Sequence, residues 1–154
     1  MAQYFQPEIE TMPREELQEL QLERMRASMR NAYDNIPLFR ERFDEAGVTP
    51  DDLASLDDLA RFPFVVKQDM RDAYPFGMFA RPNAEVARIH ASSGTTGQAT
   101  VVGHTAADLE NWGDCFARGI AMVGGDENST IQVSYGYGLF TGGLGAHAGG
   151  EAMG

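Results

Sequence analysis

One six-residue segment of this 154-residue sequence carries most of the groups that could bind a ligand. Residues 92–97 read Ser-Ser-Gly-Thr-Thr-Gly and supply four hydroxyl groups and two glycines. Glycine allows close backbone approach and positive φ angles, so several N–H groups and side-chain oxygens can converge on one anion. The segment therefore indicates a phosphate-binding loop.

Two other interpretations of this segment have to be weighed. A Walker A loop is excluded because the spacing G-x-x-x-x-G-K-[ST] is absent and because the segment leads toward Val101 and Val102, which favour a strand, instead of opening a helix. An ordinary polar hairpin without a ligand remains. Taken alone, it is the more common explanation of a short Ser/Gly/Thr-rich segment.

The residues around the loop predict the elements that hold it. Residues 86–90 and 131–135 alternate apolar and polar side chains, and with residues 100–102 they are three candidate strands. Thr105 and Asp108 have the spacing of a capping box and predict a helix that continues to residue 123. The order strand, loop, strand, helix, strand is typical of an α/β fold.

The part of the chain before the loop has a different composition. Residues 1–90 contain all seven prolines, 28 of the 35 charged residues and two of the 17 glycines. Pro13 predicts the start of a long amphipathic helix to about Tyr33, and Pro37 starts a second helix that Gly47 ends. We therefore expect a helical segment over residues 1–85 and the start of an α/β domain over residues 86–154.

The charge balance excludes several classes of partner. Twelve Lys and Arg face 23 Asp and Glu, a formal net charge of −11, and Lys67 is the single lysine. Nucleic acids and anionic membranes bind clustered cations, so neither is an expected partner. A single cysteine, Cys115, excludes an internal disulfide, and the first ten residues lack a targeting pattern, so a cytoplasmic location is expected. The three histidines lack metal-ligand spacing, and no metal site is predicted.

Three stretches in the same order resemble one enzyme family. His90 to Gly97, followed by Thr100 to Gly103, resembles the ATP-phosphate loop of the AMP-forming adenylating enzymes, specifically the phenylacetate-CoA ligases. Thr11 to Gly77 looks like the N-terminal helical region of that family, and Tyr135 to Gly145 looks like a signature on its substrate side. The resemblance spans nearly the whole chain and implies the N-terminal region of such a ligase, with part of its α/β N-terminal domain.

The resemblance implies a reaction in two half-reactions, with ATP, Mg²⁺ and CoA as cofactor and co-substrates. An aryl acid such as phenylacetate reacts with ATP to give an acyl-adenylate and pyrophosphate, and the CoA thiol then displaces AMP. Tyr135 and Phe140 are candidates for walls of the aryl-acid pocket, with packing in the core as the alternative. The residues implied to hold the β and γ phosphates are Ser92, Ser93, Gly94, Thr95, Thr96 and Gly97.

The sequence also departs from the family. Gln98 stands where the family usually has Lys, which removes a charge-assisted contact of about 1.5–3 kcal/mol. Relatives are several hundred residues long and supply the adenine pocket, a ribose-binding Asp, a metal-binding Glu and a catalytic Lys elsewhere. We expect no catalytic residue in this chain and no turnover by the chain alone. The alternative is an inactive, truncated interaction or assembly module that associates with itself. The candidate macromolecular partners are thus a second copy of this chain and, for the ligase, a complementing ligase fragment.

Overall fold

The computed structural model describes residues 4–92 and 97–154, and the chain divides into two compact units. Unit 1 joins Met1–Thr11 to Asn83–Gly154, and unit 2 comprises Met12–Pro82. No helix in the described part of the chain is long and apolar enough to cross a membrane. That residues 1–85 form a separate helical domain stays a prediction.

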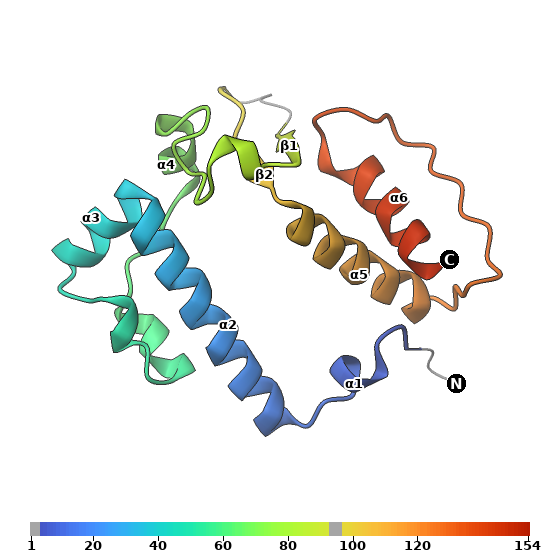
Figure 1. Ribbon diagram of the computed structural model, residues 1–154, viewed down its shortest axis with the longest axis horizontal. Helices are drawn as coiled ribbons and strands as arrows, with labels where there is room; N and C mark the ends of the chain where they lie inside the picture. Colours follow the sequence, from blue (N-terminus) through green and yellow to red (C-terminus); the bar gives the residue numbers. More distant parts are fainter. Residues whose placement is uncertain (1–3, 93–96) are drawn as a thin grey trace. The chain divides into compact units, whose positions relative to one another are not determined.

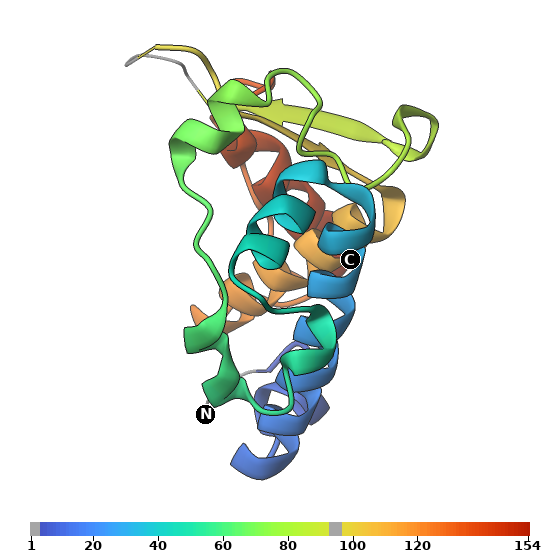
Figure 2. The ribbon, with the colours of Figure 1, turned by 90° about the vertical axis from the view of Figure 1, so that its left-hand side faces the viewer.

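Unit 2 is helical, as its composition predicts. The predicted long helix and the helix that follows it are both present, and Gly47 ends the second of them at a φ of +65°. Figure 2 shows the long helix beside the shorter one that follows it. The elements of unit 2 are α2 (Arg14–Asn35), α3 (Pro37–Glu45), the 3-10 turns η1 (Pro50–Asp52) and η2 (Leu56–Arg61), and α4 (Lys67–Asp72).

The core of unit 2 lies between α2, α3 and the two 3-10 turns. Phe43 is 2% exposed, and its ring lies 5.2 Å from the ring of Phe62 in an edge-on arrangement. Full burial of such a side chain stabilises the fold by about 1.5–3 kcal/mol. The other buried members are Val48 and Leu53, and the half-buried residues that pack on them are Leu22, Met25, Met29, Tyr33 and Phe39.

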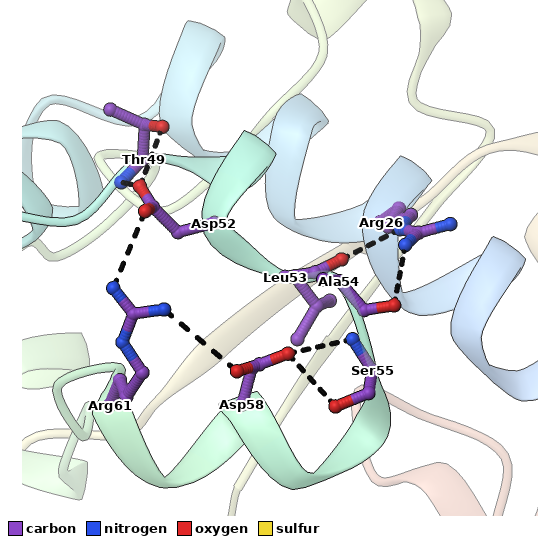
Figure 3. Close-up of polar contacts among 8 residues, drawn as sticks. All are labelled: Arg26, Thr49, Asp52, Leu53, Ala54, Ser55, Asp58 and Arg61. Carbon is purple, nitrogen blue, oxygen red and sulfur yellow. Dashed lines mark hydrogen bonds and ion pairs between the residues drawn. The ribbon is translucent and has the colours of Figure 1, made fainter.

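In both 3-10 turns of unit 2, the third residue is an aspartate that caps the start of the turn (Figure 3). The backbone N–H of Thr49 donates to Asp52 Oδ2 at 2.8 Å, and that of Ser55 donates to Asp58 Oδ2 at 2.7 Å. Arg61 lies between the two acids, 3.4 Å from Asp52 and 3.8 Å from Asp58. The two turns therefore share one cation.

These caps predict a loss of stability in acid. Hydrogen bonds from Thr49 lower the pKa of Asp52, and hydrogen bonds from Ser55 lower that of Asp58, with Arg61 adding to both. Because the folded pKa lies below the unfolded value of about 3.9, this stabilisation is present above that value and is lost as the pH falls through the folded pKa. We expect a smaller decrease in urea midpoint between pH 7 and pH 3 in an Asp52→Asn, Asp58→Asn double variant than in the parent chain.

Asp57→Asn is the matched control for this comparison. Its side chain is exposed and has no hydrogen bond with any residue that the structure describes. The control should retain the decrease of the parent chain, and an equal decrease in all three proteins would contradict the assignment.

Unit 1 contains the strands and helix that the sequence predicts around the loop. The strands are β1 (Arg88–Ala91) and β2 (Val101–His104), which pair antiparallel with Arg88 opposite His104 and Ala91 opposite Val101. The helix is α5 (Ala106–Met122), and its capping box is complete. Thr105 N donates to Asp108 Oδ2 at 2.8 Å, and Asp108 N donates to Thr105 Oγ1 at 3.2 Å. The fold class, helices followed by part of an α/β domain, is confirmed.

Residues 131–154 of unit 1 differ from the sequence-based expectation. The third strand predicted over residues 131–135 is wrong, because these residues join no strand in the described chain. Instead, a helix that was not predicted, α6 (Thr141–Met153), packs along α5 (Figure 1). The remaining elements of unit 1 are the short α1 (Pro7–Glu10) and η3 (Asn83–Glu85).

One glutamine, Gln6, joins the N-terminal residues of unit 1 to α5 through hydrogen bonds. The side-chain nitrogen Nε2 of Gln6 donates to Asp114 Oδ2 at 2.8 Å, and Arg118 Nε donates to Gln6 Oε1 at 2.8 Å. A second Arg118 nitrogen, Nη2, contacts the same oxygen. Gln6 therefore binds one acidic and one basic residue that lie on successive turns of α5.

Candidate functional site

A small pocket in unit 1 adjoins the start of the candidate phosphate loop. Its volume is about 230 Å³. It is formed by the end of β1, by residues on and before β2, and by the start of α6. The lining residues are His90, Ala91, Ser92, Thr100, Val102, Phe140 and Thr141.

Ser92 and Thr100 close the base of the loop. Ser92 N donates to the carbonyl oxygen of Thr100 at 3.0 Å, and Thr100 N donates to Ser92 Oγ at 3.0 Å. These bonds continue the β1–β2 pairing by one step. Since the Ser92 hydroxyl acts here as an acceptor, its proton stays available to a ligand in the pocket.

Of the six predicted loop residues, the structure describes the first and the last. Gly97 has a φ of +133°, which L side chains rarely adopt, and a Cβ there would meet no atom within 4 Å. Backbone geometry, not lack of space, therefore requires glycine at this position. Ser93, Gly94, Thr95 and Thr96 lie outside the described residues.

The two aromatic candidates for the acid pocket lie together. The rings of Tyr135 and Phe140 stack at 5.8 Å with an interplanar angle of 21°. Phe140 lines the pocket with Ser92, whereas Tyr135 contacts the pocket only through the Phe140 ring. Because the two residues are 63% and 48% exposed, neither belongs to the buried core of this chain.

One lining residue of this pocket is a buried histidine that the sequence analysis did not assign to the site. His90 is 1% exposed, and its Nδ1 lies 3.0 Å from the carbonyl oxygen of Leu139. Its ring contacts Trp112 at 5.0 Å and His104 at 5.5 Å. The alternation of residues along β1 directs position 90 inward, but nothing in the sequence marks a backbone carbonyl 49 residues away as its partner.

His90 is the one ionisable side chain in the described lining of the pocket. None of its lining residues is Lys, Arg, Asp or Glu, so hydroxyls and backbone groups are the available donors. Burial lowers the pKa of the neighbouring His104, and His90 and Arg88 lower it further while Asp108 opposes them. His104 therefore holds its proton less tightly than an ordinary histidine.

The described residues offer no separate metal or nucleophile site. Nowhere in residues 4–92 and 97–154 do three His, Cys, Asp or Glu side chains gather to hold a metal ion. Cys115 is exposed on α5 and follows Asp114 in the sequence.

Comparison of the sequence with known proteins identifies relatives of this chain. No family model matches the sequence. The chain is 57% identical over 146 residues to the phenylacetate-coenzyme A ligase of Pseudomonas putida, covering 95% of this chain and 33% of that protein. The ligase of Escherichia coli strain K12 is 54% identical over the same length. This chain is homologous to part of the phenylacetate-coenzyme A ligases. It spans about a third of the length of the curated relatives it matches.

Solved structures of CoA ligases agree with this relationship. The 2-hydroxyisobutyryl-CoA ligase in complex with 2-HIB-AMP and CoA, in the thioesterification state, matches with a TM-score of 0.87 and 34% identity. That match covers 96% of this chain and 32% of the ligase. The same ligase in its postadenylation state, with 2-HIB-AMP, matches with a TM-score of 0.82 and 31% identity over 92% of this chain and 30% of that one. The resemblance to the phenylacetate-CoA ligases is confirmed, with the chain corresponding to a part of such an enzyme.

Proposed function

We propose that this chain supplies the ATP-phosphate loop and part of the aryl-acid pocket of a phenylacetate-CoA ligase. The observation that carries the proposal is that Ser92, the first loop residue, and Phe140, an aromatic pocket candidate, line one pocket. Adenylation requires the phosphates and the carboxylate to meet at one place, so the two sites have to adjoin. The reaction converts phenylacetate, ATP and CoA into phenylacetyl-CoA, AMP and pyrophosphate.

The phosphate side of the pocket works with neutral donors. The groups that would hold the β and γ phosphates of ATP are the hydroxyls of Ser92, Ser93, Thr95 and Thr96 and the backbone N–H groups of Gly94 and Gly97. Preorganised donors of this kind stabilise the charge that develops as the acid carboxylate attacks the α phosphorus and pyrophosphate leaves. The pocket lining holds no carboxylate, so we assign no Mg²⁺ ligand to this chain.

The acid side of the pocket is aromatic. The stacked rings of Tyr135 and Phe140 offer a flat face of the kind on which a phenyl ring stacks, an interaction of about 0.5–1.5 kcal/mol. The solved 2-hydroxyisobutyryl-CoA ligase holds an acyl-AMP and CoA, which supports adenylate chemistry in this group of proteins. We assign no residue of this chain to CoA.

The proposal predicts that the phosphate loop determines nucleotide affinity. In calorimetric titrations of Mg²⁺-ATP, a Thr95→Ala, Thr96→Ala double variant should lose the binding that the parent chain shows. Gln98→Lys should bind more tightly, because a restored cation contributes about 1.5–3 kcal/mol, roughly tenfold to a hundredfold in affinity.

Ser129→Ala is the matched control for the loop variants. Ser129 lies in unit 1 but does not line the pocket next to the loop, and its hydroxyl contacts Asp126. This control should bind Mg²⁺-ATP like the parent chain. Identical titration curves for all four proteins would remove the loop from the nucleotide site.

A further inference from the structure

The buried His90 makes a contact that joins two distant parts of the chain. Its Nδ1 lies 3.0 Å from the Leu139 carbonyl oxygen, and the backbone N–H of Ala91 donates to the same oxygen at 2.8 Å. A carbonyl only accepts hydrogen bonds, so His90 Nδ1 must carry a proton. One backbone oxygen ahead of α6 therefore receives two bonds from the end of β1.

The other ring nitrogen of His90 is buried without a hydrogen-bond partner in the described chain. The ring packs edge-on against Trp112, with centroids 5.0 Å apart and planes at 70°. Buried polar atoms in folded proteins nearly always have partners, so a position that leaves one unpaired calls for an explanation. Only one of the two ring nitrogens of His90 therefore has a hydrogen-bond partner among the described residues.

The segment before α6 is held at two described places, the Leu139 carbonyl oxygen and the Tyr137 hydroxyl, which lies 3.0 Å from His147 Nδ1 of α6. Leu139 has a side chain that is 60% exposed, and Phe140 at the N-cap of α6 receives no side-chain capping bond. The segment nevertheless leads directly to Phe140 and Thr141, which line the pocket beside Ser92. The bonds to the Leu139 carbonyl thus join the residue before Phe140 directly to the end of β1, where the loop begins.

We propose that His90 is a positioning residue, which sets the distance between the phosphate loop and the aromatic wall by donating its Nδ1 proton to the Leu139 carbonyl. The significance of this role for ligation rests on the proposed function, whereas the contact itself does not. His90 acts through Leu139 and Phe140 and takes no part in bond making or breaking.

The first test examines the contact in the chain itself. In ¹⁵N NMR spectra of the parent chain, the His90 ring should be protonated at Nδ1. A His90 ring protonated at Nε2 alone would overturn the proposal. This measurement uses no variant, so it decides the point even where a substitution at residue 90 prevents folding.

The second test uses amide hydrogen exchange in three variants. His90→Leu should speed exchange at Ala91 and over residues 139–143, because one of the two bonds to Leu139 is lost. His90→Asn should restore slow exchange, since its side-chain amide nitrogen takes the place of Nδ1. His104→Leu is the control, because His104 also contacts Trp112 but has no bond to Leu139 among those described. Parent-like exchange in His90→Leu would overturn the proposal.

The third test asks whether the contact between His90 and Leu139 affects the affinity for Mg²⁺-ATP. In titrations of Mg²⁺-ATP, His90→Leu should bind about tenfold more weakly than the parent chain, as expected for a displaced binding group. His90→Asn and His104→Leu should match the parent chain. If the parent chain binds and His90→Leu binds equally well, the positioning role is wrong while the proposed function stands. If the parent chain does not bind, the proposed function fails, and the NMR and exchange results still decide the role of His90.

Discussion

Replacing Gly149 with alanine is expected to destabilise unit 1 by about 2–3 kcal/mol, through overpacking between α5 and α6. A Cβ at this position would lie 2.4 Å from Phe116 Cβ, 3.1 Å from Phe116 C and 3.2 Å from Ala117 N. These atoms belong to the backbone of α5 or are bonded directly to it, so no side-chain rotation relieves the clash. The two helices would have to move apart.

The neighbouring glycine provides the matched control for this prediction. A Cβ at Gly150 would lie 3.5 Å from Ile131 Cδ1, an ordinary van der Waals distance. Gly150→Ala should therefore raise the free energy of unfolding, by up to about 0.8–1.0 kcal/mol, because alanine favours a helix over glycine. Urea unfolding followed by near-ultraviolet circular dichroism measures both variants. Equal midpoints for Gly149→Ala and Gly150→Ala would show that α5 and α6 do not pack this closely.

The 154-residue polypeptide is expected to release no pyrophosphate in response to phenylacetate. Precise positioning of reactants supplies about 7–11 kcal/mol of catalysis in favourable cases, and the contacts proposed here reach only the phosphates and the aromatic ring. The chain spans about a third of the length of the ligases that it matches. A coupled pyrophosphate assay with Mg²⁺-ATP, phenylacetate and CoA tests this expectation.

The Pseudomonas putida phenylacetate-coenzyme A ligase, assayed under the same conditions, is the positive control. Robust aryl-CoA synthesis by the unmodified 154-residue polypeptide would overturn the expectation. The calorimetric titration separates the two functional hypotheses, because an interaction or assembly module with a vestigial loop would show neither turnover nor loop-dependent Mg²⁺-ATP binding.

The helices of unit 2 and α5 could be predicted because local signals decide them. Pro13 and Pro37 precede or open their helices, Gly47 adopts the left-handed conformation that ends α3, and the capping box of Thr105 and Asp108 starts α5. Each signal acts within one or two turns of its own position. No tertiary contact is needed to read it.

The helix α6 could not be predicted, because its stability comes from tertiary packing. Five of its thirteen residues are glycine, and each costs about 1 kcal/mol relative to alanine in an isolated helix. These glycines let α6 approach Trp112 and Phe116, since a Cβ at Gly145 would lie 2.6 Å from Phe116 Cε2. The alternation at residues 131–135 wrongly predicted a strand, again because tertiary packing decides. Ile131 lies near Gly150 of α6 and not in a sheet.

The candidate site was only partly accessible from the sequence. The composition of residues 92–97 indicated an anion-binding loop, and the family resemblance supplied Tyr135 and Phe140. The contact between His90 and Leu139 could not be inferred, because any residue type has the same carbonyl oxygen. Backbone acceptors leave no trace in a sequence, whereas glycines and hydroxyl side chains do.

The attachment of Gln6 to α5 has a consequence for how the chain is made. Asp114 and Arg118 follow Gln6 by 108 and 112 residues, so at about 5–20 residues per second the ribosome delivers them about 5–20 s after Gln6. Met12–Pro82, which form a unit of their own, are complete before α5 is synthesised. Gln6 is therefore synthesised well before its native partners, and all of Met12–Pro82 is synthesised between them.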